Sequence, residues 1–139
     1  MEIKFTKRLK NATLPIKATK GAAGYDLTSV AKDDDGEIIT YDTGLSIAIP
    51  SGYVGLLFSR SSVYKTGLLQ CNAVGVLDPD YTGPIKFKFW KYDKTRTEYN
   101  VGERIGQLVI SPALEVNFKE VDELDETDRG EGGFGSTGK

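Results

Sequence analysis

Residues 72–89 read NAVGVLDPDYTGPIKFKF and carry the clearest fold signal in the chain. At the end of this stretch, Ile85, Phe87 and Phe89 alternate with lysines, a period of two that is typical of a half-buried β-strand. An apolar run comes before them, and a turn rich in Pro, Asp and Gly separates the two. Apolar segments on both sides of such a turn predict two strands joined by a hairpin.

Short apolar runs recur along the rest of the chain. They lie at 2–6, 45–49, 53–58 and 105–110, and Gly or Pro interrupts or ends several of them. Nowhere do apolar residues recur at helical spacing for three turns, and the best helical candidate is one or two turns within 61–66. Many short strands separated by Gly and Pro turns predict an all-β fold, either a barrel or a sandwich.

The composition bounds the size of the protein and excludes several classes of function. The 139 residues are enough for one domain, and with one cysteine, Cys71, and no histidine the usual zinc sites and Ser-His or Cys-His nucleophiles are excluded. A formal net charge of −2 gives no sign of nucleic acid or an anionic membrane as a partner. The single cysteine and the lack of a long apolar segment lead us to expect a soluble, cytoplasmic protein.

The character of the sequence changes toward the C-terminus. Acidic residues crowd the stretch after Glu115, and the last residues are rich in glycine. Such a segment buries too little apolar surface to offset its chain entropy, so alone it should be disordered. We therefore divide the chain into an all-β domain at 1–118, an acidic linker at 119–128 and a glycine-rich tail at 129–139.

Three side chains give the 72–83 stretch a chemical character. Asn72 is an amide that can read a base, Asp78 is a carboxylate that can accept a proton, and Tyr81 supplies a flat ring. Together they are what a nucleotide pocket needs. The alternative is a plain turn, because Asp, Pro and Gly are the commonest turn residues.

Five segments in order carry a family resemblance. They are AGYDL at 23–27, SRSS at 59–62, GVLDPDYTG at 75–83, GERIGQLVI at 102–110 and RGEGGFGSTG at 129–138. The set closely resembles the five motifs of the homotrimeric dUTP pyrophosphatases (dUTPases) in order and spacing. The resemblance covers nearly the whole chain and implies a single-domain β-barrel or jelly-roll-like fold, called a β-clip in this family. It also implies a homotrimer whose sites are shared between subunits, with Asp78 and the closing tail of one site coming from different chains.

The resemblance implies an activity as well as a fold. These enzymes hydrolyse dUTP to dUMP and pyrophosphate by in-line attack of an activated water on the α-phosphorus. The reaction limits uracil incorporation into DNA and supplies dUMP for dTMP synthesis. Mg²⁺ is the implied cofactor, held mainly by the triphosphate, which agrees with the lack of a metal-ligand cluster in the sequence.

The roles of the site residues follow by position in the motifs. Asp78 resembles the aspartate that orients and deprotonates the attacking water, and Tyr81 resembles the ring that packs under the deoxyribose and excludes a 2′-hydroxyl. Phe134 resembles the tail aromatic that stacks on uracil, and Asp26 the carboxylate that steadies a metal-bound water. Asn72 resembles the residue that pairs with the uracil edge, beside the backbone of Gly75 and Val76. The phosphate and tail contacts that the resemblance implies are Arg60, Ser61, Ser62, Gln107, Arg129, Gly135, Ser136 and Thr137.

Several alternatives stay open at this point. Asp26 could simply pair with Arg104 across strands, and Asp80 is expected to be a turn residue. A dCTP deaminase shares two of the motifs, but it needs a glutamate where this chain has Lys88. A dUTP-binding regulator or a structural module of the same fold is a further alternative. An additional interaction role is also open, and we expect the polar excursion at 91–100, which is predicted to be a hairpin over 92–100, to offer its surface to a protein partner. We also expect Trp90 to be buried in the core.

A few residues depart from the family pattern without touching a catalytic atom. Ser59 stands where many members have Pro, Gly106 where many have Ala, and Pro84 where Glu or Asn is common.

Overall fold

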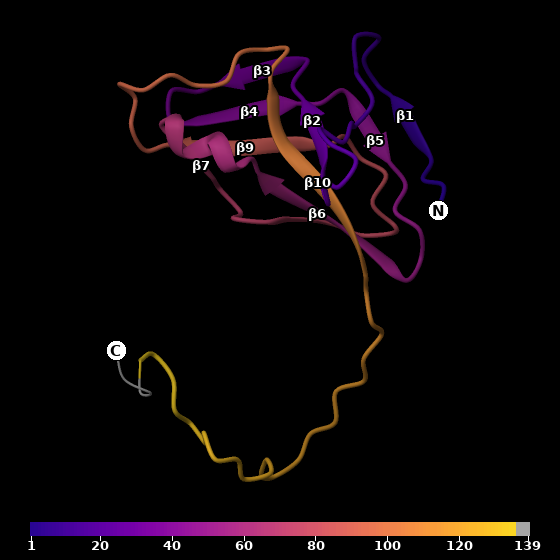
Figure 1. Ribbon diagram of the computed structural model, residues 1–139, viewed down its shortest axis with the longest axis vertical. Helices are drawn as coiled ribbons and strands as arrows, with labels where there is room; N and C mark the ends of the chain where they lie inside the picture. Colours follow the sequence, from indigo (N-terminus) through magenta and orange to yellow (C-terminus); the bar gives the residue numbers. More distant parts are fainter. Residues whose placement is uncertain (136–139) are drawn as a thin grey trace.

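The computed structural model describes residues 1–135, which form a body of short strands followed by an extended C-terminal arm (Figure 1). The body confirms the all-β class, and the helical turn expected within 61–66 is a short 3₁₀-helix. Among the described residues, no helix is long and apolar enough to cross a membrane. The elements are β1 (Phe5–Lys7), β2 (Tyr25–Thr28), β3 (Ala31–Asp34), β4 (Ile38–Asp42), β5 (Leu45–Ile47), β6 (Tyr53–Ser59), η1 (Ser61–Lys65), β7 (Leu68–Gln70), β8 (Gly75–Leu77), β9 (Lys86–Lys91) and β10 (Arg104–Pro112).

The strands form two four-stranded sheets and one two-stranded sheet. The strand orders are β2-β10-β6-β8 and β3-β4-β9-β7, and β1 pairs with β5. Every pairing is antiparallel. Leu108 of β10 lies opposite Leu57 of β6, and Phe87 of β9 lies opposite Tyr41 of β4. These four apolar side chains are all buried, so each sheet contributes apolar residues to the core.

The hairpin predicted within residues 72–89 is wrong, although both of its strands are present. The first strand, β8, pairs with β6, whereas the second, β9, pairs with β4 and β7 in the other sheet. The turn after Leu77 therefore carries the chain from one sheet to the other. In a fold of packed sheets, two neighbouring strands can bury their apolar faces by facing each other across the core instead of pairing edge to edge.

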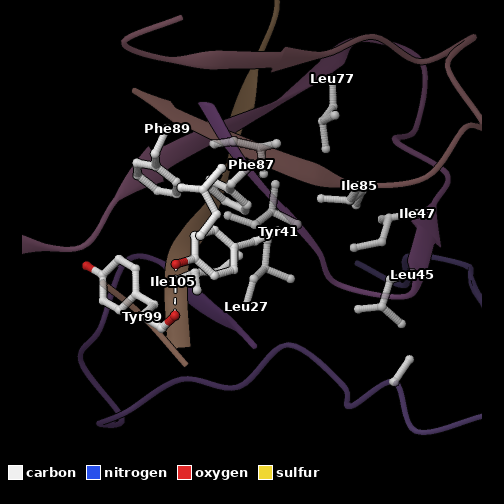
Figure 2. Close-up of a cluster of buried hydrophobic side chains, with 14 of the residues drawn as sticks. Leu27, Tyr41, Leu45, Ile47, Leu77, Ile85, Phe87, Phe89, Tyr99 and Ile105 are labelled. Carbon is white, nitrogen blue, oxygen red and sulfur yellow. Dashed lines mark hydrogen bonds between the residues drawn. The ribbon is translucent and has the colours of Figure 1, made fainter. Parts of the chain in front are cut away.

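Aromatic side chains from β4 and β9 form the centre of the core (Figure 2). Phe87 and Phe89 stack with ring centroids 6.2 Å apart, and Tyr41 meets Phe89 edge-on at 5.9 Å. The alternation in β9 that the sequence predicts is confirmed, because Phe87 and Phe89 are buried and the lysines between and before them are exposed. The expectation for Trp90 is wrong: it is 50% exposed, since the residue after an inward Phe89 must point outward.

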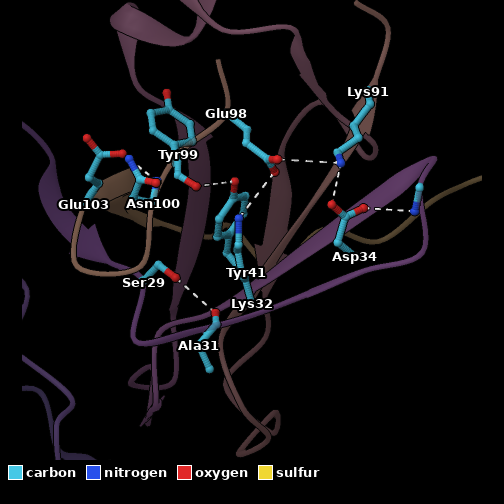
Figure 3. Close-up of polar contacts among 11 residues, drawn as sticks. Ser29, Ala31, Lys32, Asp34, Tyr41, Lys91, Glu98, Tyr99, Asn100 and Glu103 are labelled. Carbon is cyan, nitrogen blue, oxygen red and sulfur yellow. Dashed lines mark hydrogen bonds and ion pairs between the residues drawn. The ribbon is translucent and has the colours of Figure 1, made fainter. Parts of the chain in front are cut away.

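The 92–100 excursion is tied to the body by polar contacts (Figure 3). The buried Tyr41 hydroxyl donates a hydrogen bond to the Tyr99 carbonyl at 2.8 Å, and burial raises the pKa of Tyr41 above its ordinary value. Lys91 pairs with Asp34 and, at 3.8 Å, with Glu98. The segment forms no strand, so the hairpin expected at 92–100 is wrong, and the excursion is a loop held against the body by these contacts.

Gly106 provides a test of how tightly the two sheets pack. A Cβ atom placed there would lie 2.2 Å from Phe87 Cε1 and 2.9 Å from the Phe58 carbonyl oxygen, so Ala does not fit without displacing the core. We expect Gly106→Ala to lower the free energy of unfolding by about 1–3 kcal/mol, as overpacking does. Urea denaturation measures this. Gly21→Ala is the matched control, because no atom lies within 4 Å of a Cβ at that position. Equal stability of the two variants would contradict the expected clash.

Candidate functional site

A pocket of about 490 Å³ lies beside β8 and the turn that follows it. Its volume falls within the usual range for small-molecule sites. Five residues predicted from the sequence line this pocket together: Asn72, Gly75, Val76, Asp78 and Tyr81. The other lining residues are Leu57, Gln70, Cys71, Leu77, Pro84, Ile85, Lys86 and Lys88.

Strand β8 forms one wall of the pocket. Gly75 and Leu77 are buried and Val76 between them is 58% exposed, which is the alternation expected of a strand. Within the described residues β8 is the last strand of its sheet and pairs with β6 alone, so its other backbone edge can hydrogen-bond to a ligand.

Tyr81 is held in place by the turn that contains it. Its hydroxyl donates a hydrogen bond to the Pro84 carbonyl at 3.0 Å. A Cβ atom on Gly83 would lie 2.5 Å from the Tyr81 hydroxyl oxygen, so the glycine leaves room for the ring. The unusual Pro84 does not disturb this contact, since the backbone carbonyl is the acceptor.

Asp78 lies at the start of the same turn and is exposed. The Tyr81 backbone N–H donates to the Asp78 carbonyl at 3.1 Å, which fixes the backbone of this turn. Within residues 1–135, the Asp78 carboxylate takes part in no ion pair. The carboxylate is therefore free to accept a hydrogen bond or a proton from a bound molecule.

A second group of predicted residues lies outside the lining of this pocket. The Arg104 guanidinium donates to Asp26 at 2.8 Å, so the cross-strand pair that the sequence left open is present. Arg60 approaches the other Asp26 oxygen at 3.7 Å, and its guanidinium donates to the Arg104 carbonyl at 3.4 Å. The Asp26 carboxylate therefore contacts the guanidinium groups of both Arg60 and Arg104. The predicted contact of Asp26 with a metal-bound water stays a prediction.

Gln107 belongs to this second group. Its side-chain N–H donates to the Ser59 carbonyl at 3.4 Å. A Cβ atom on Gly24 would lie 2.4 Å from the Gln107 Oε1 atom, so the glycine of the first motif makes room for the amide of the fourth. Ser61 and Ser62 begin η1, directly after Arg60. The group therefore gathers donors from two motifs, at 59–62 and 102–110, around the Asp26 carboxylate of the first.

The tail residues form a third group on the arm. Figure 1 shows the arm leaving the body after β10 and running away from it. Arg129 Nε donates to the Gly132 carbonyl at 2.7 Å, and Phe134 is fully exposed with a left-handed backbone, φ 50°. Gly135 also has a positive φ, of 92°. The predicted contacts of Ser136 and Thr137 lie outside the described residues.

The sequence did not single out Gln70, although this residue holds Asn72. Its Nε2 atom donates to the Asn72 Oδ1 atom at 3.2 Å and to the Leu57 carbonyl at 3.1 Å. Gln70 shares the inward face of β7 with Leu68. A polar residue at an inward position of a strand was the signal that could have identified it.

The described residues contain no metal cage. Within residues 1–135, no group of three or more His, Cys, Asp or Glu side chains could hold a metal ion. A divalent cation bound by an all-protein site needs such a set of oxygen ligands.

Comparison with known proteins gives one consistent family. The dUTPase family model matches residues 10–138. The chain is 41% identical over 131 residues to a deoxyuridine 5'-triphosphate nucleotidohydrolase of Pseudomonas fluorescens, covering 90% of this chain and 87% of the relative. It is 39% identical over 145 residues to the enzyme of the same name from Paraburkholderia phymatum, covering 100% and 98%.

Solved structures agree with the sequence comparisons. The Staphylococcus bacteriophage 80alpha dUTPase with dUpNHpp superposes with a TM-score of 0.84 at 32% identity, covering 99% of each chain. A mutant dUTPase from phage phi11 of S. aureus, described as coordinating a structural Mg(II) ion, gives a TM-score of 0.76 at 27% identity. It covers 88% of this chain and 98% of the phage chain.

Proposed function

The chain belongs to the dUTPase family and is a dUTP diphosphatase, and on that premise we propose which of its residues carry out the reaction. The enzyme hydrolyses dUTP to dUMP and pyrophosphate. The observation that supports the assignment of residues is the pocket that brings Asn72, Asp78 and Tyr81 together beside an edge strand.

Uracil binds between Asn72 and the outer edge of β8. The base presents carbonyl oxygens and an N–H along one edge, and the backbone of an edge strand offers matching donors and acceptors. The close approach is possible because Gly75 has no side chain, and Val76 lines the pocket next to it. Phe134 of a tail stacks on the exposed face of the base, a contact of about 1–3 kcal/mol.

Asp78 takes the proton from the attacking water. Its carboxylate is exposed in the pocket and takes part in no ion pair among the described residues, so it is available as a general base. The turn that begins at Asp78 also holds Tyr81, so the base and the sugar-binding ring are placed by one piece of backbone.

Arg60, Ser61, Ser62 and Gln107 bind the phosphates, together with Arg129, Ser136 and Thr137 of the tail. The Arg60 guanidinium pairs with the Asp26 carboxylate and donates a hydrogen bond to the Arg104 carbonyl. These two contacts hold the guanidinium in one orientation. A pre-oriented guanidinium and hydroxyl donors stabilise the negative charge that grows on the phosphates during hydrolysis.

Magnesium enters as part of the substrate. The described residues offer no metal cage, and a triphosphate supplies the oxygen ligands that Mg²⁺ prefers. The bound ion neutralises phosphate charge and fixes the conformation of the triphosphate. We keep the cytoplasm as the proposed location, which the free thiol of Cys71 supports.

The arm supports a homotrimer with shared sites. Leu114, Val116 and Phe118 alternate along it and are 86%, 60% and 97% exposed, an apolar face that water does not favour. A second pocket of about 500 Å³ near β1 is lined by apolar residues that include Ile3 and Phe5. The arm of one subunit packs into this pocket of its neighbour and so carries the tail toward the neighbour's site.

A substrate panel tests the function. Pyrophosphate release from dUTP, dCTP, dTTP and UTP, measured side by side with Mg²⁺, should be fastest for dUTP. Lys88 lines the pocket where a deaminase needs a carboxylate, so dCTP should yield no dUTP. Release of ammonia from dCTP would contradict the assignment.

Tyr81 should exclude ribonucleotides. Its ring is anchored through the Pro84 carbonyl, and we expect it to leave no room for a 2′-hydroxyl beneath the sugar. Tyr81→Ala is therefore expected to raise the kcat/KM for UTP relative to dUTP by about tenfold or more, since a shape barrier is removed. Steady-state kinetics on both substrates measure the ratio. Tyr92→Phe, a change outside the pocket, is the control, and an unchanged ratio in Tyr81→Ala would remove Tyr81 from this role.

A further inference from the structure

A chain of hydrogen bonds through the buried Gln70 side chain connects Ser59 to Asn72, which lines the pocket. Gln70 is 6% exposed, and every polar atom of its side chain has a partner. The Ser59 hydroxyl donates to Gln70 Oε1 at 2.8 Å, and Gln70 Nε2 donates to the Leu57 carbonyl at 3.1 Å and to Asn72 Oδ1 at 3.2 Å. We call these side chains, Ser59, Gln70 and Asn72, the Gln70 relay.

The Leu57 carbonyl determines the direction of the whole relay. A backbone carbonyl accepts hydrogen bonds and cannot donate them, so the Gln70 atom that faces it must be the nitrogen. The second hydrogen on this nitrogen points at Asn72, which must offer its oxygen. The Asn72 amide therefore keeps its nitrogen, Nδ2, for another partner.

The Asn72 nitrogen lies beside Gly75, and within residues 1–135 no hydrogen bond from it is formed. A Cβ atom built on Gly75 would be 3.3 Å from Asn72 Nδ2, and both residues line the pocket. The relay thus presents a hydrogen-bond donor, and not an acceptor, to whatever binds beside β8.

We propose that Gln70 is a positioning residue that makes the pocket select a base with a carbonyl group over one with an amino group. This inference rests on the proposed binding of uracil at Asn72. Uracil, like thymine, offers a carbonyl oxygen at the position where cytosine carries an amino group. An Asn72 donor pairs with that oxygen, whereas against the amino group two donors would face each other unpaired.

Ser59 holds the far end of the relay. It stands where many members of the family have proline, which has no hydroxyl to donate. Rotating the Asn72 amide by half a turn would place its nitrogen against the Gln70 nitrogen, and the Leu57 carbonyl prevents Gln70 from turning to compensate. Leaving a buried donor unpaired is unfavourable, so the orientation of Asn72 is set before the substrate arrives.

Gln70→Met tests the proposal. Methionine fills a similar volume in a buried slot and cannot form the hydrogen bonds, so the Asn72 amide becomes free to rotate. The readout is the ratio of dissociation constants for the non-hydrolysable α,β-imido analogues of dCTP and dUTP, measured by calorimetry on the full chain. We expect Gln70→Met to reduce the preference for the dUTP analogue by about tenfold, the effect of one unpaired hydrogen-bonding group.

Gln70→Leu provides a second variant that also lacks every hydrogen bond of the relay and differs from methionine in shape. The preference for the dUTP analogue should fall about as far as in Gln70→Met. A preference within about twofold of the wild type in the folded variants would overturn the proposal.

Ser29→Ala is the control for general loss of stability. Ser29 is fully buried and donates to the Ala31 carbonyl at 3.0 Å, away from the pocket. Its loss should lower the melting temperature and leave the preference unchanged. An equal change of preference in Ser29→Ala would show that destabilisation alone explains the effect, which overturns the role of Gln70. A wild-type chain that shows no preference for the dUTP analogue would contradict the proposed function itself.

Discussion

Replacing Asp78 by asparagine is expected to lower kcat for dUTP by about 10²–10⁴-fold, the usual contribution of a general base. The chain has no histidine that could act as the base. Of the two aspartates in the turn after β8, Asp78 is the one that lines the pocket. Asparagine keeps the size of the side chain but cannot take a proton at neutral pH. Binding should survive, so the dissociation constant for the α,β-imido analogue of dUTP should change little while the rate collapses.

Asp80→Asn is the matched control for this prediction. Asp80 lies two residues away in the same exposed turn and is absent from the pocket lining. We expect its kcat to stay within about twofold of the wild type, as for surface substitutions away from a site. Near-normal turnover in Asp78→Asn, or an equal loss in Asp80→Asn, would exclude Asp78 as the base.

Mixing two inactive chains should restore activity if the site is shared between subunits. One chain carries Asp78→Asn and an intact tail, and the other keeps Asp78 but ends at Asp128 and so lacks Arg129 and Phe134. Each should be nearly inactive alone, because every site then lacks either its base or its closing tail. In a random equal mixture of cyclic trimers, about a quarter of the sites would contain Asp78 from one chain and a tail from another.

The structure supports this design. In the single chain the tail lies on an arm that runs away from the body (Figure 1). The residues between Pro112 and Arg129 can extend by about 3.3 Å each, far enough to reach a neighbouring subunit. Mass spectrometry must first show that subunits exchange and that the mixed species are trimers. If exchanged trimers recover no activity, each chain closes its own site and the shared site is wrong, while the dUTP diphosphatase activity stands.

Much of the fold could be predicted from the sequence because its signals are local. The alternation of Ile85, Phe87 and Phe89 marks a strand wherever that strand pairs, and it is confirmed in β9. The same rule, applied one residue further, would have placed Trp90 outside the core, where the structure has it. The order and spacing of the five motifs were enough to identify the family, because both can be read directly from the sequence without knowing which residues are in contact.

Pairing partners and buried polar contacts were decided by the tertiary structure alone. The sequence determined that strands precede and follow the Asp78 turn, but not that β8 and β9 belong to different sheets. It also left Gln70 unnoticed, because the role of a buried amide depends on Leu57 and Ser59, which are more than ten residues away in the chain. Alternation and turn chemistry act between neighbours in sequence, whereas sheet order and hydrogen-bond partners depend on which distant segments pack together, and that is set by burial of the whole core.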